Sequence, residues 1–553
     1  MINKTLLITN LTEDIDYKFS ENESIFTYNF NSGKVLSKNF KNLNNAKILN
    51  VLALSEKENY SSFIYSKNKL FLSENLIFNN NLSLYFLSIF SNKRTEFFNT
   101  YNYYLHILIL RSVLKETSFN SICCIGFSDR QIDQLSLNLG CDIKSINRSI
   151  SVNYKYLAFK NFIFYFKAIF YLTFIKLFLK NNNFPVNKVF FANFPKHFES
   201  NLKQKKYGNL TQNPENSFLL SLISDGFHQN LNLKDFVKAL FYLKGKSQDK
   251  KFNVLDLYLS YKDIVWSLKY FFKINKSYKK LTKVNHILNG VILNNQIKSE
   301  LELSFYQTPR ILMYFKAYMR FFEETKPKQM VYYLHEYSLG RFISYILRNY
   351  FPQIKSYGFQ HGPISKRKML YALAKFEVCG SENNLYNVPL PMNNYCEDIY
   401  SKKIYESYGY SNLIINDRIQ RLDYLNFVKR EQIKLNTCLV ACGLHDANNI
   451  IDYVLKSKIY LEKKIFIKLH PYSQNKVLIK KITSVGNQNL TIATKPLTEY
   501  FNFVEEVIST YSSVGYEAYY LGIKTTLLVF NYKINESPLL EIENKDSIKI
   551  IYA

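Results

Sequence analysis

The stretch QMVYYLHEYSLGRFISYILRNYFPQIKSYGFQHG, residues 329–362, decides the fold class. It holds two short apolar runs, Met330 to Leu334 and Lys355 to Phe359, separated by a segment long enough for one helix. Short apolar strands that alternate with helices are typical of parallel α/β proteins. The alternation continues downstream, with strands predicted at Phe376 to Cys379, Thr437 to Cys442, Lys464 to Leu469, Leu490 to Ala493, Glu506 to Ser509, Thr525 to Phe530 and Ser547 to Tyr552. The sequence therefore predicts an α/β protein.

Upstream of this stretch the pattern is less regular. Residues 1–150 indicate another α/β unit, with strands predicted at Lys4 to Thr9, Ala46 to Ala53 and Ser121 to Phe127 and a helix at Tyr103 to Lys115. A further strand is predicted at Lys188 to Ala192, and residues 195–330 are biased toward helix. A lysine-rich helical linker is predicted at Val428 to Leu435. We therefore expect two domains: residues 1–430 with a helical insertion at about 150–325, and residues 431–553.

The composition narrows the class of partner. The chain has 553 residues and a net charge of +28, which attracts phosphate-bearing partners such as nucleotide-sugars, anionic lipids or nucleic acid. No RNA-binding or DNA-binding motif accompanies that charge, so nucleic acid is not expected. The seven cysteines form no C-x-x-C pair and indicate reduced thiols. The Asp14-Ile15-Asp16 triplet lacks the sequence context of a metal site, so we expect neither metal nor bound cofactor.

The segment Tyr156 to Lys180, YLAFKNFIFYFKAIFYLTFIKLFLK, has three interpretations. It is a helix packed in the protein, a helix lying in a membrane interface, or a helix that crosses the membrane. Lys167 and Lys176 interrupt the apolar run, and a lysine near mid-bilayer costs about 2.5–3.5 kcal/mol. An interfacial helix whose lysines reach back to the headgroups tolerates them. The N-terminal run MINKTLLITN has too short an apolar core for a signal peptide, which favours a cytoplasmic protein.

Polar residues follow the predicted strands. His335 and Glu336 follow one strand and His361 the next, and His445 and the His470-Pro471 pair follow two later strands, so four of the eight histidines occupy this position. Ligands of open parallel sheets bind beyond the carboxyl ends of the strands. We therefore expect these side chains to line a ligand site, although any single histidine could simply terminate a strand.

The residues differ in the chemistry they offer. Ser512, Ser513 and Gly515 occupy a strand-to-helix turn, where free N–H groups and hydroxyls suit a phosphate, although a simple helix cap explains Ser512 equally well. Glu517, one turn later, is a ribose ligand or a partner of the helix dipole. Glu336, held in a cleft, is a candidate general base for an acceptor hydroxyl.

Taken in order, these motifs resemble the bacterial GT-B glycosyltransferases of surface-carbohydrate biosynthesis. The GFQHG turn (358–362) is similar to the turn that closes their N-terminal domain. KLHPY (468–472) and STYSSVGYEAYYLG (509–522) resemble the His-Pro and Ser-Ser motifs of sialic acid, polysialic acid and Kdo transferases, and NDRIQRL (416–422) resembles their Asn-x-Arg element. The resemblance implies two Rossmann-like domains facing a cleft and a metal-independent reaction. No acidic Asp/Glu-Asp/Glu-Gly motif surrounds Glu336, so the acidic residue of those enzymes has no full counterpart here.

The function expected from the resemblance is glycosyl transfer. The donor would be a nucleotide-sugar, such as a CMP-linked nonulosonate or Kdo, and the acceptor a surface polysaccharide or lipid-linked glycan at the inner face of the membrane. Catalysis is assigned to Glu336 and His361, and donor binding to His445, His470, Pro471, Ser512, Ser513, Gly515 and Glu517. Two alternatives stay open: a non-catalytic glycan-binding assembly or export protein, and a nucleotide-sugar epimerase.

Overall fold

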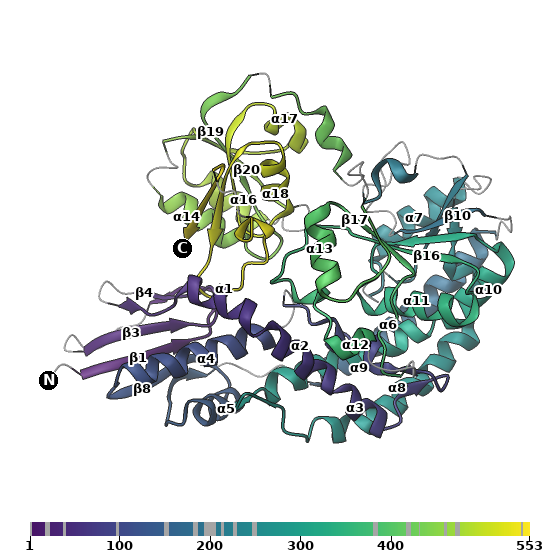
Figure 1. The fold of residues 1–553 in the computed structure, drawn as a ribbon, viewed down its shortest axis with the longest axis horizontal. Coiled ribbons are helices and arrows are strands. Elements are labelled where there is room, and N and C mark those ends of the chain that lie inside the picture. The colour runs from purple at the N-terminus through teal and green to yellow at the C-terminus, as the bar shows by residue number, and fades with distance from the viewer. Residues whose placement is uncertain are drawn as a thin grey trace.

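A computed structural model shows three parallel β-sheets joined by helices (Figure 1). It describes residues 3–16, 23–36, 40–95, 99–148, 154–180, 186–192, 206–211, 215–224, 229–245, 252–379, 385–415, 422–430, 432–457, 462–470, 476–542 and 546–553. The α/β prediction is confirmed, and all three sheets have the strand order of doubly wound, Rossmann-like units, in which the order reverses beside the first strand.

The first sheet has the order β5-β3-β1-β8-β9, with strands β1 (Asn3–Thr9), β3 (Glu23–Asn29), β5 (Lys41–Asn42), β8 (Ser121–Phe127) and β9 (Lys144–Arg148). The helices in this part of the chain are α1 (Ala46–Ser55), α2 (Lys57–Ser66), α3 (Asn68–Ser73), α4 (Thr100–Glu116) and α5 (Asp129–Leu139). Helices α2 and α3 extend away from the first sheet (Figure 1), and their Tyr65 and Asn68 donate to the carbonyls of Tyr386 and Leu385. The strand predicted at Ala46 to Ala53 is wrong, because this segment is helix α1. The Asn45 side chain caps the helix by accepting from the N–H groups of Lys47 and Ile48.

The second sheet has the order β12-β11-β10-β15-β16-β17-β18. Its strands are β10 (Lys188–Ala192), β11 (Asn216–Leu220), β12 (Phe252–Val254), β15 (Gln329–Tyr332), β16 (Lys355–Phe359), β17 (Asn393–Cys396) and β18 (Leu413–Ile415). Its helices are α6 (Tyr154–Phe178), α7 (Leu233–Gly245), α8 (Tyr261–Leu281), α9 (Asn294–Leu312), α10 (Phe315–Thr325), α11 (Ser338–Tyr350), α12 (Lys375–Cys379) and α13 (Ile399–Ser407).

The helical insertion predicted at about 150–325 contains helices α6 to α10, and it also contributes β10, β11 and β12 to the second sheet. One prediction for this region is wrong. Phe376 to Cys379, predicted as a strand, lies in helix α12, where the Glu377 carboxylate accepts the N–H of Ala374 and so holds the first turn.

The third sheet has the order β21-β20-β19-β22-β23-β24, with strands β19 (Lys434–Ala441), β20 (Lys464–Lys468), β21 (Leu490–Ile492), β22 (Val504–Ser509), β23 (Lys524–Val529) and β24 (Ile548–Tyr552). Its helices are α14 (Ala447–Lys456), α16 (Lys476–Thr483), α17 (Leu497–Phe501) and α18 (Ser513–Tyr520). The predicted helical linker is wrong in its described part, because the short 3-10 helix ends at Phe427 and β19 begins at Lys434.

Short elements complete the fold. Small two-stranded pairs are β2 (Ile15–Asp16) with β4 (Val35–Leu36), β6 (Ile77–Phe78) with β7 (Leu82–Ser83), and β13 (Ile287–Leu288) with β14 (Val291–Ile292). The 3-10 helices are η1 (Leu84–Leu87), η2 (Phe90–Asn92), η3 (Gly208–Thr211), η4 (Leu255–Tyr258), η5 (Met369–Tyr371), η6 (Asp423–Phe427) and η7 (Pro538–Leu540).

The cores show how the sheets are grouped. One continuous apolar cluster runs from Leu6 in the first sheet to Tyr410 beside the second, so these two sheets share a core. The third sheet has apolar clusters of its own on its two faces. The division of the chain at residues 430 and 431 stays a prediction, and this separation of cores agrees with it.

The segment after β23 ties the third sheet to the other two. Asn102 Nδ2 donates to the carbonyl of Tyr532 over 2.9 Å, and the N–H of Asn535 donates to Asn50 Oδ1 over 2.8 Å. The Arg367 guanidinium lies 2.8 Å from Glu541. The third sheet is thus held against both neighbours by polar bonds between residues far apart in the sequence. Figure 1 shows this sheet above the first sheet and beside the second.

Candidate active site

A buried carboxylate flanked by two histidines lies at the carboxyl edge of the second sheet. The chain passes from β10 outward to β12 and then returns to β15, so the order of the strands reverses between β10 and β15. Glu336 follows β15 and is fully buried. Its Oε2 lies 3.2 Å from Nδ1 of His335, and its Oε1 lies 3.1 Å from Nδ1 of His361, which follows β16. The topology therefore brings together both predicted catalytic residues.

Two glycines make room for this arrangement. A Cβ on Gly340 would lie 2.0 Å from the Leu334 carbonyl oxygen, so only glycine allows the tight turn from β15 into α11. A Cβ on Gly358 would lie 2.8 Å from Cγ of His335, so this glycine of β16 lets the imidazole pack against the strand.

Burial and charge oppose each other at this site. Burial raises the pKa of the Glu336 carboxyl, while His335 and the ammonium groups of Lys368 and Lys206 act to lower it. Burial lowers the pKa of His335, and Glu336 acts to raise it. Nδ1 of each imidazole lies within 3.2 Å of a carboxylate oxygen, so a proton on Nδ1 would lie next to the carboxylate. The Tyr405 hydroxyl lies 3.4 Å from Nε2 of His335.

His361 is the member of this cluster that reaches solvent. Its side chain is 18% exposed, whereas those of His335 and Glu336 are 0% exposed. The rings of Tyr333 and Tyr337 lie 5.7 and 6.2 Å from its ring. A carboxylate that orients Nδ1 leaves Nε2 of a neutral imidazole as the atom that takes up a proton. The arrangement therefore suits proton transfer at His361, with Glu336 holding the ring.

The second group of predicted residues lies at the carboxyl edge of the third sheet. There the strand order reverses between β19 and β22. Asp446, which precedes α14, is buried and accepts a hydrogen bond from the Thr510 hydroxyl after β22. Burial raises the pKa of Asp446, and the Thr510 hydroxyl acts to lower it. The N–H of His445 lies 3.2 Å from the Tyr511 hydroxyl.

A cavity of about 180 Å³ opens at this edge. One wall comes from the third sheet and includes His445, Asp446 and Lys533. The opposite wall comes from the first sheet and α4, and includes Asn31 after β3 and Asn102 in α4. The Nδ2 of Asn102 donates to Tyr532, while its Oδ1 is buried and has no hydrogen-bond partner within the described ranges. A buried unpaired acceptor in a cavity wall is a position for a ligand donor.

The remaining residues predicted to bind the sugar donor lie in different structural settings. His470 follows β20, and its pKa is lowered by burial and by the nearby His445, so the two imidazoles are neighbours. Ser512 caps α18, because its Oγ accepts the N–H of Val514 over 3.4 Å, and Ser513 begins the helix. Pro471 lies outside the described residues.

Two further predicted residues have structural roles in α18. A Cβ on Gly515 would lie 2.0 Å from Ser509 Oγ, so this glycine lets the helix pack tightly on β22. Glu517 is buried and accepts a hydrogen bond from the Tyr424 hydroxyl. It does not line the cavity.

The cavity and the histidine cluster are linked through one short segment of the chain. Thr95 lines the cavity and donates to Glu536. The guanidinium of the preceding residue, Arg94, lies 4.9 Å from the ring of Tyr337, which in turn contacts His361. The sequence analysis did not identify Thr95, Arg94 or the cavity wall that includes Asn31 and Asn102. No local motif marks them, because they meet the site only through packing between sheets.

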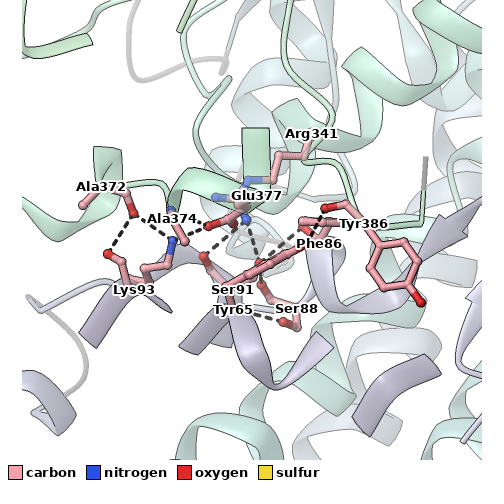
Figure 2. Close-up of polar contacts among 11 residues, drawn as sticks. Tyr65, Phe86, Ser88, Ser91, Lys93, Arg341, Ala372, Ala374, Glu377 and Tyr386 are labelled. Carbon is pink, nitrogen blue, oxygen red and sulfur yellow. Dashed lines mark hydrogen bonds and ion pairs between the residues drawn. The ribbon is translucent and has the colours of Figure 1, made fainter. Parts of the chain in front are cut away.

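Charged residues next to this segment are buried. Lys93 Nζ lies 2.9 Å from Glu377 Oε2 and donates to the Ala372 carbonyl over 2.8 Å. Arg341 from α11 donates to Ser91 Oγ over 2.7 Å. Figure 2 shows these contacts, which join the loop before α4 to α11 and α12. In the described part of the chain, no set of three or more His, Cys, Asp or Glu side chains is arranged to hold a metal ion.

Comparison with known proteins adds little to this geometry. No protein-family model matches the chain, and no curated protein matches its sequence. Among solved structures, the chain is similar to a UDP-GlcNAc 2-epimerase from Neisseria meningitidis bound to UDP-GlcNAc. The identity is 12% and the TM-score 0.34, and the match covers 66% of this chain and 86% of that one. A likeness at this TM-score gives no information about function.

Proposed function

We propose that this protein is a GT-B-type glycosyltransferase that transfers a sugar from a nucleotide-activated donor to a glycan hydroxyl. The observation that carries the proposal is the Glu336–His361 pair, a fully buried carboxylate 3.1 Å from the Nδ1 of a partly exposed imidazole. This pair lies at the carboxyl edge of one parallel sheet, and a polar cavity lies at the carboxyl edge of another. Such edges are where α/β proteins bind their ligands.

In the proposed reaction, Nε2 of His361 takes the proton of the acceptor hydroxyl. The hydroxyl oxygen forms a bond to the anomeric carbon of the donor, and the bond from that carbon to the phosphate oxygen breaks. Glu336 stabilises the imidazolium that results and acts as a positioning residue. This assignment moves the role of general base from Glu336, where it was predicted, to His361, because Glu336 is fully buried and His361 is the residue with access to solvent.

The leaving nucleotide would carry negative charge away from the donor. His445, His470 and the amino end of α18 at Ser512 and Ser513 are the groups proposed to stabilise that charge. Asn31 and Asn102 in the cavity wall would form hydrogen bonds with sugar hydroxyls. In finer detail, we propose a CMP-linked nonulosonate or Kdo as the donor and a surface polysaccharide or lipid-linked glycan as the acceptor, on the motif resemblance described above.

Binding and catalysis can be tested separately. Thermal-shift measurements with CMP, CDP, UDP and GDP should show stabilisation by one nucleotide, and the shift should be lost in His470→Ala. Transfer of a radiolabelled sugar should fall by about 10²–10⁴-fold in His361→Gln, while nucleotide binding is unchanged. His286→Gln is the matched control, because His286 is another histidine, is buried and lies just before β13, outside the site.

Two outcomes would overturn the proposal in different ways. Conversion of the donor without an acceptor would indicate an epimerase. Absence of any nucleotide shift, combined with unchanged glycan binding in His361→Gln, would indicate a non-catalytic assembly or export protein.

A further inference from the structure

Helix α6 has one face packed into the protein. Phe164, Ala168, Tyr171, Leu172 and Ile175 are buried in the apolar core beneath it. The Tyr171 ring stacks on Phe236 of α7 at 3.9 Å.

A buried polar contact also anchors this face. The Asn161 Oδ1 accepts from the Arg310 guanidinium over 2.9 and 3.2 Å. Phe159–Phe178 is one span in the described ranges long and apolar enough to cross a membrane, and 39% of it is buried. A helix fixed to the fold in this way does not cross a membrane alone.

The opposite face of α6 is apolar and exposed. Phe162 and Phe166 are 71% and 68% exposed, and Leu177 is 73% exposed. Successive residues of a helix turn by about 100°, so six exposed apolar side chains fall within roughly 100° of the circumference. They are Phe159, Phe162, Phe166, Ile169, Phe170 and Leu177, whereas Phe178, 36% exposed, lies outside this arc.

Lysines border this apolar face on both sides. By the same geometry Lys160 and Lys167 lie along one border, and Lys176 lies along the other. All three are exposed. The described part of α6 holds no acidic residue. An apolar stripe between rows of lysines is typical of a helix lying in a membrane interface, where lysine stems extend along the apolar layer toward the headgroups.

The two neighbouring helices extend the face beyond both borders. On one side, Lys176 lies 5.3 Å from the ring of Tyr261 in α8, and Thr173 is hydrogen-bonded to the same residue at 2.8 Å. On the other side, Lys244 of α7 lies 4.9 Å from the ring of Phe178. Exposed apolar residues of these helices are Leu233, Val237 and Phe241 in α7 and Tyr261, Val265 and Phe272 in α8.

The charge of α7 and α8 indicates which kind of partner would cover the exposed apolar face. Helices α7 and α8 carry Lys234, Lys238, Lys244, Lys262, Lys269, Lys273 and Lys276. Asp263 is buried and paired with Arg320 at 2.8 Å, which leaves Asp235 as the other acidic residue in the two helices. An apolar face surrounded by cations complements an anionic bilayer, whereas a second copy of the same face would bring lysines against lysines.

We infer that the exposed faces of α6, α7 and α8 form one membrane-docking surface, with α6 lying in the plane of an anionic bilayer. The phenylalanines of α6 enter the boundary between headgroups and acyl chains, and the bordering lysines contact lipid phosphates. This inference goes beyond the proposed glycosyl transfer and does not depend on it.

Flotation of the full chain with vesicles tests the inference. The protein should float with vesicles of phosphatidylglycerol and phosphatidylcholine, less so with pure phosphatidylcholine, and the binding should weaken as salt is raised. Lys160→Glu/Lys167→Glu/Lys176→Glu should weaken anionic binding by roughly a hundredfold, since each lysine near such a surface contributes about fivefold. Phe162→Ser/Phe166→Ser/Phe170→Ser should abolish flotation on both.

The matched control is Phe376→Ser/Phe427→Ser, which changes two phenylalanines of similar exposure away from this surface and should float like the wild type. All side chains changed are exposed, and circular dichroism would verify that each variant is folded. Equal binding to neutral and anionic vesicles, or unchanged flotation of the phenylalanine variant, would overturn the inference. So would a wild-type dimer in light scattering that fails to float and that the phenylalanine substitutions dissociate, because that would make the surface an interface between copies.

Discussion

Replacement of Lys93 by Met should destabilise the protein by about 3 kcal/mol, at the low end of the range for breaking a buried ion pair. The ammonium is 1% and the Glu377 carboxylate 0% exposed, and they lie 2.9 Å apart. At an effective dielectric constant of 20, their attraction is about 6 kcal/mol before the cost of desolvation. Methionine keeps the length of the stem, so the loss reports the charge and not a cavity.

Two features of the site keep the expected loss near 3 kcal/mol. The Glu377 carboxylate retains the Ala374 N–H at 3.1 Å after the substitution. Arg341 also lies close enough to depress the pKa of Lys93, so a second cation remains to balance the carboxylate. Burial is the main cause of the lowered pKa of Lys93, so the native ion pair already includes the desolvation cost of the ammonium.

The assay is urea unfolding combined with hydrogen exchange of residues 86–95 and 369–379, because a chain with three sheets need not unfold in a single step. Exchange in both segments should accelerate in Lys93→Met. The double variant Lys93→Met/Glu377→Gln should recover most of the loss, because no unpaired charge then stays buried. A loss below about 1 kcal/mol for the single variant, or a double variant no better than the single one, would refute the reasoning.

Three further predictions concern buried groups elsewhere. Burial raises the pKa of Glu300 to about 8, so the protonated carboxyl stabilises the fold below pH 4.5 and this stabilisation is lost as pH rises through 8. The Glu300→Gln variant should therefore lose about 3–5 kcal/mol of the change in unfolding free energy with pH, measured by urea unfolding from pH 5 to 8.5. Burial lowers the pKa of His106 to about 4, so stability should fall by up to about 3 kcal/mol as pH drops from 6.5 to 4, and a flat wild-type profile over that range would contradict the assignment of a neutral ring. Gly515→Ala should cost at least about 1–3 kcal/mol in thermal unfolding, because its Cβ would lie 2.0 Å from Ser509 Oγ, whereas Gly245→Ala, where a Cβ meets nothing within 4 Å and φ is not positive, should cost less in the same measurement.

The sequence predicted best those elements whose apolar runs are continuous and flanked by polar turns. Strand β16 was predicted with its observed bounds, and β15, β20 and β23 were predicted within one or two residues at each end. The strand order could not be read from these runs, because it depends on which strands meet after long crossovers. Helix α1 was mistaken for a strand because four apolar residues cluster in a short run, while the Asn45 cap that decides for helix is a single side chain.

The candidate site was predicted unevenly for a similar reason. Glu336 and His361 were found because each follows a predicted strand, and adjacent parallel strands then bring them together. Their division of roles required burial, which the sequence does not show. Asn102 and Arg94 lie far from every motif. Asn102 lines the cavity because the first sheet packs against the third, and Arg94 reaches the histidine cluster because it lies against Tyr337 beside the second sheet.

The bonds that join the segment after β23 to the first sheet have a consequence for the order of events during protein synthesis. Asn50 and Asn102 leave the ribosome more than 400 residues before their partners Asn535 and Tyr532. The wall that Asn102 contributes to the cavity is therefore made early, but its opposite wall is made last. A nascent chain would hold its histidine cluster before it had a complete cavity, so the cavity could take up a ligand only once nearly the whole chain had been translated.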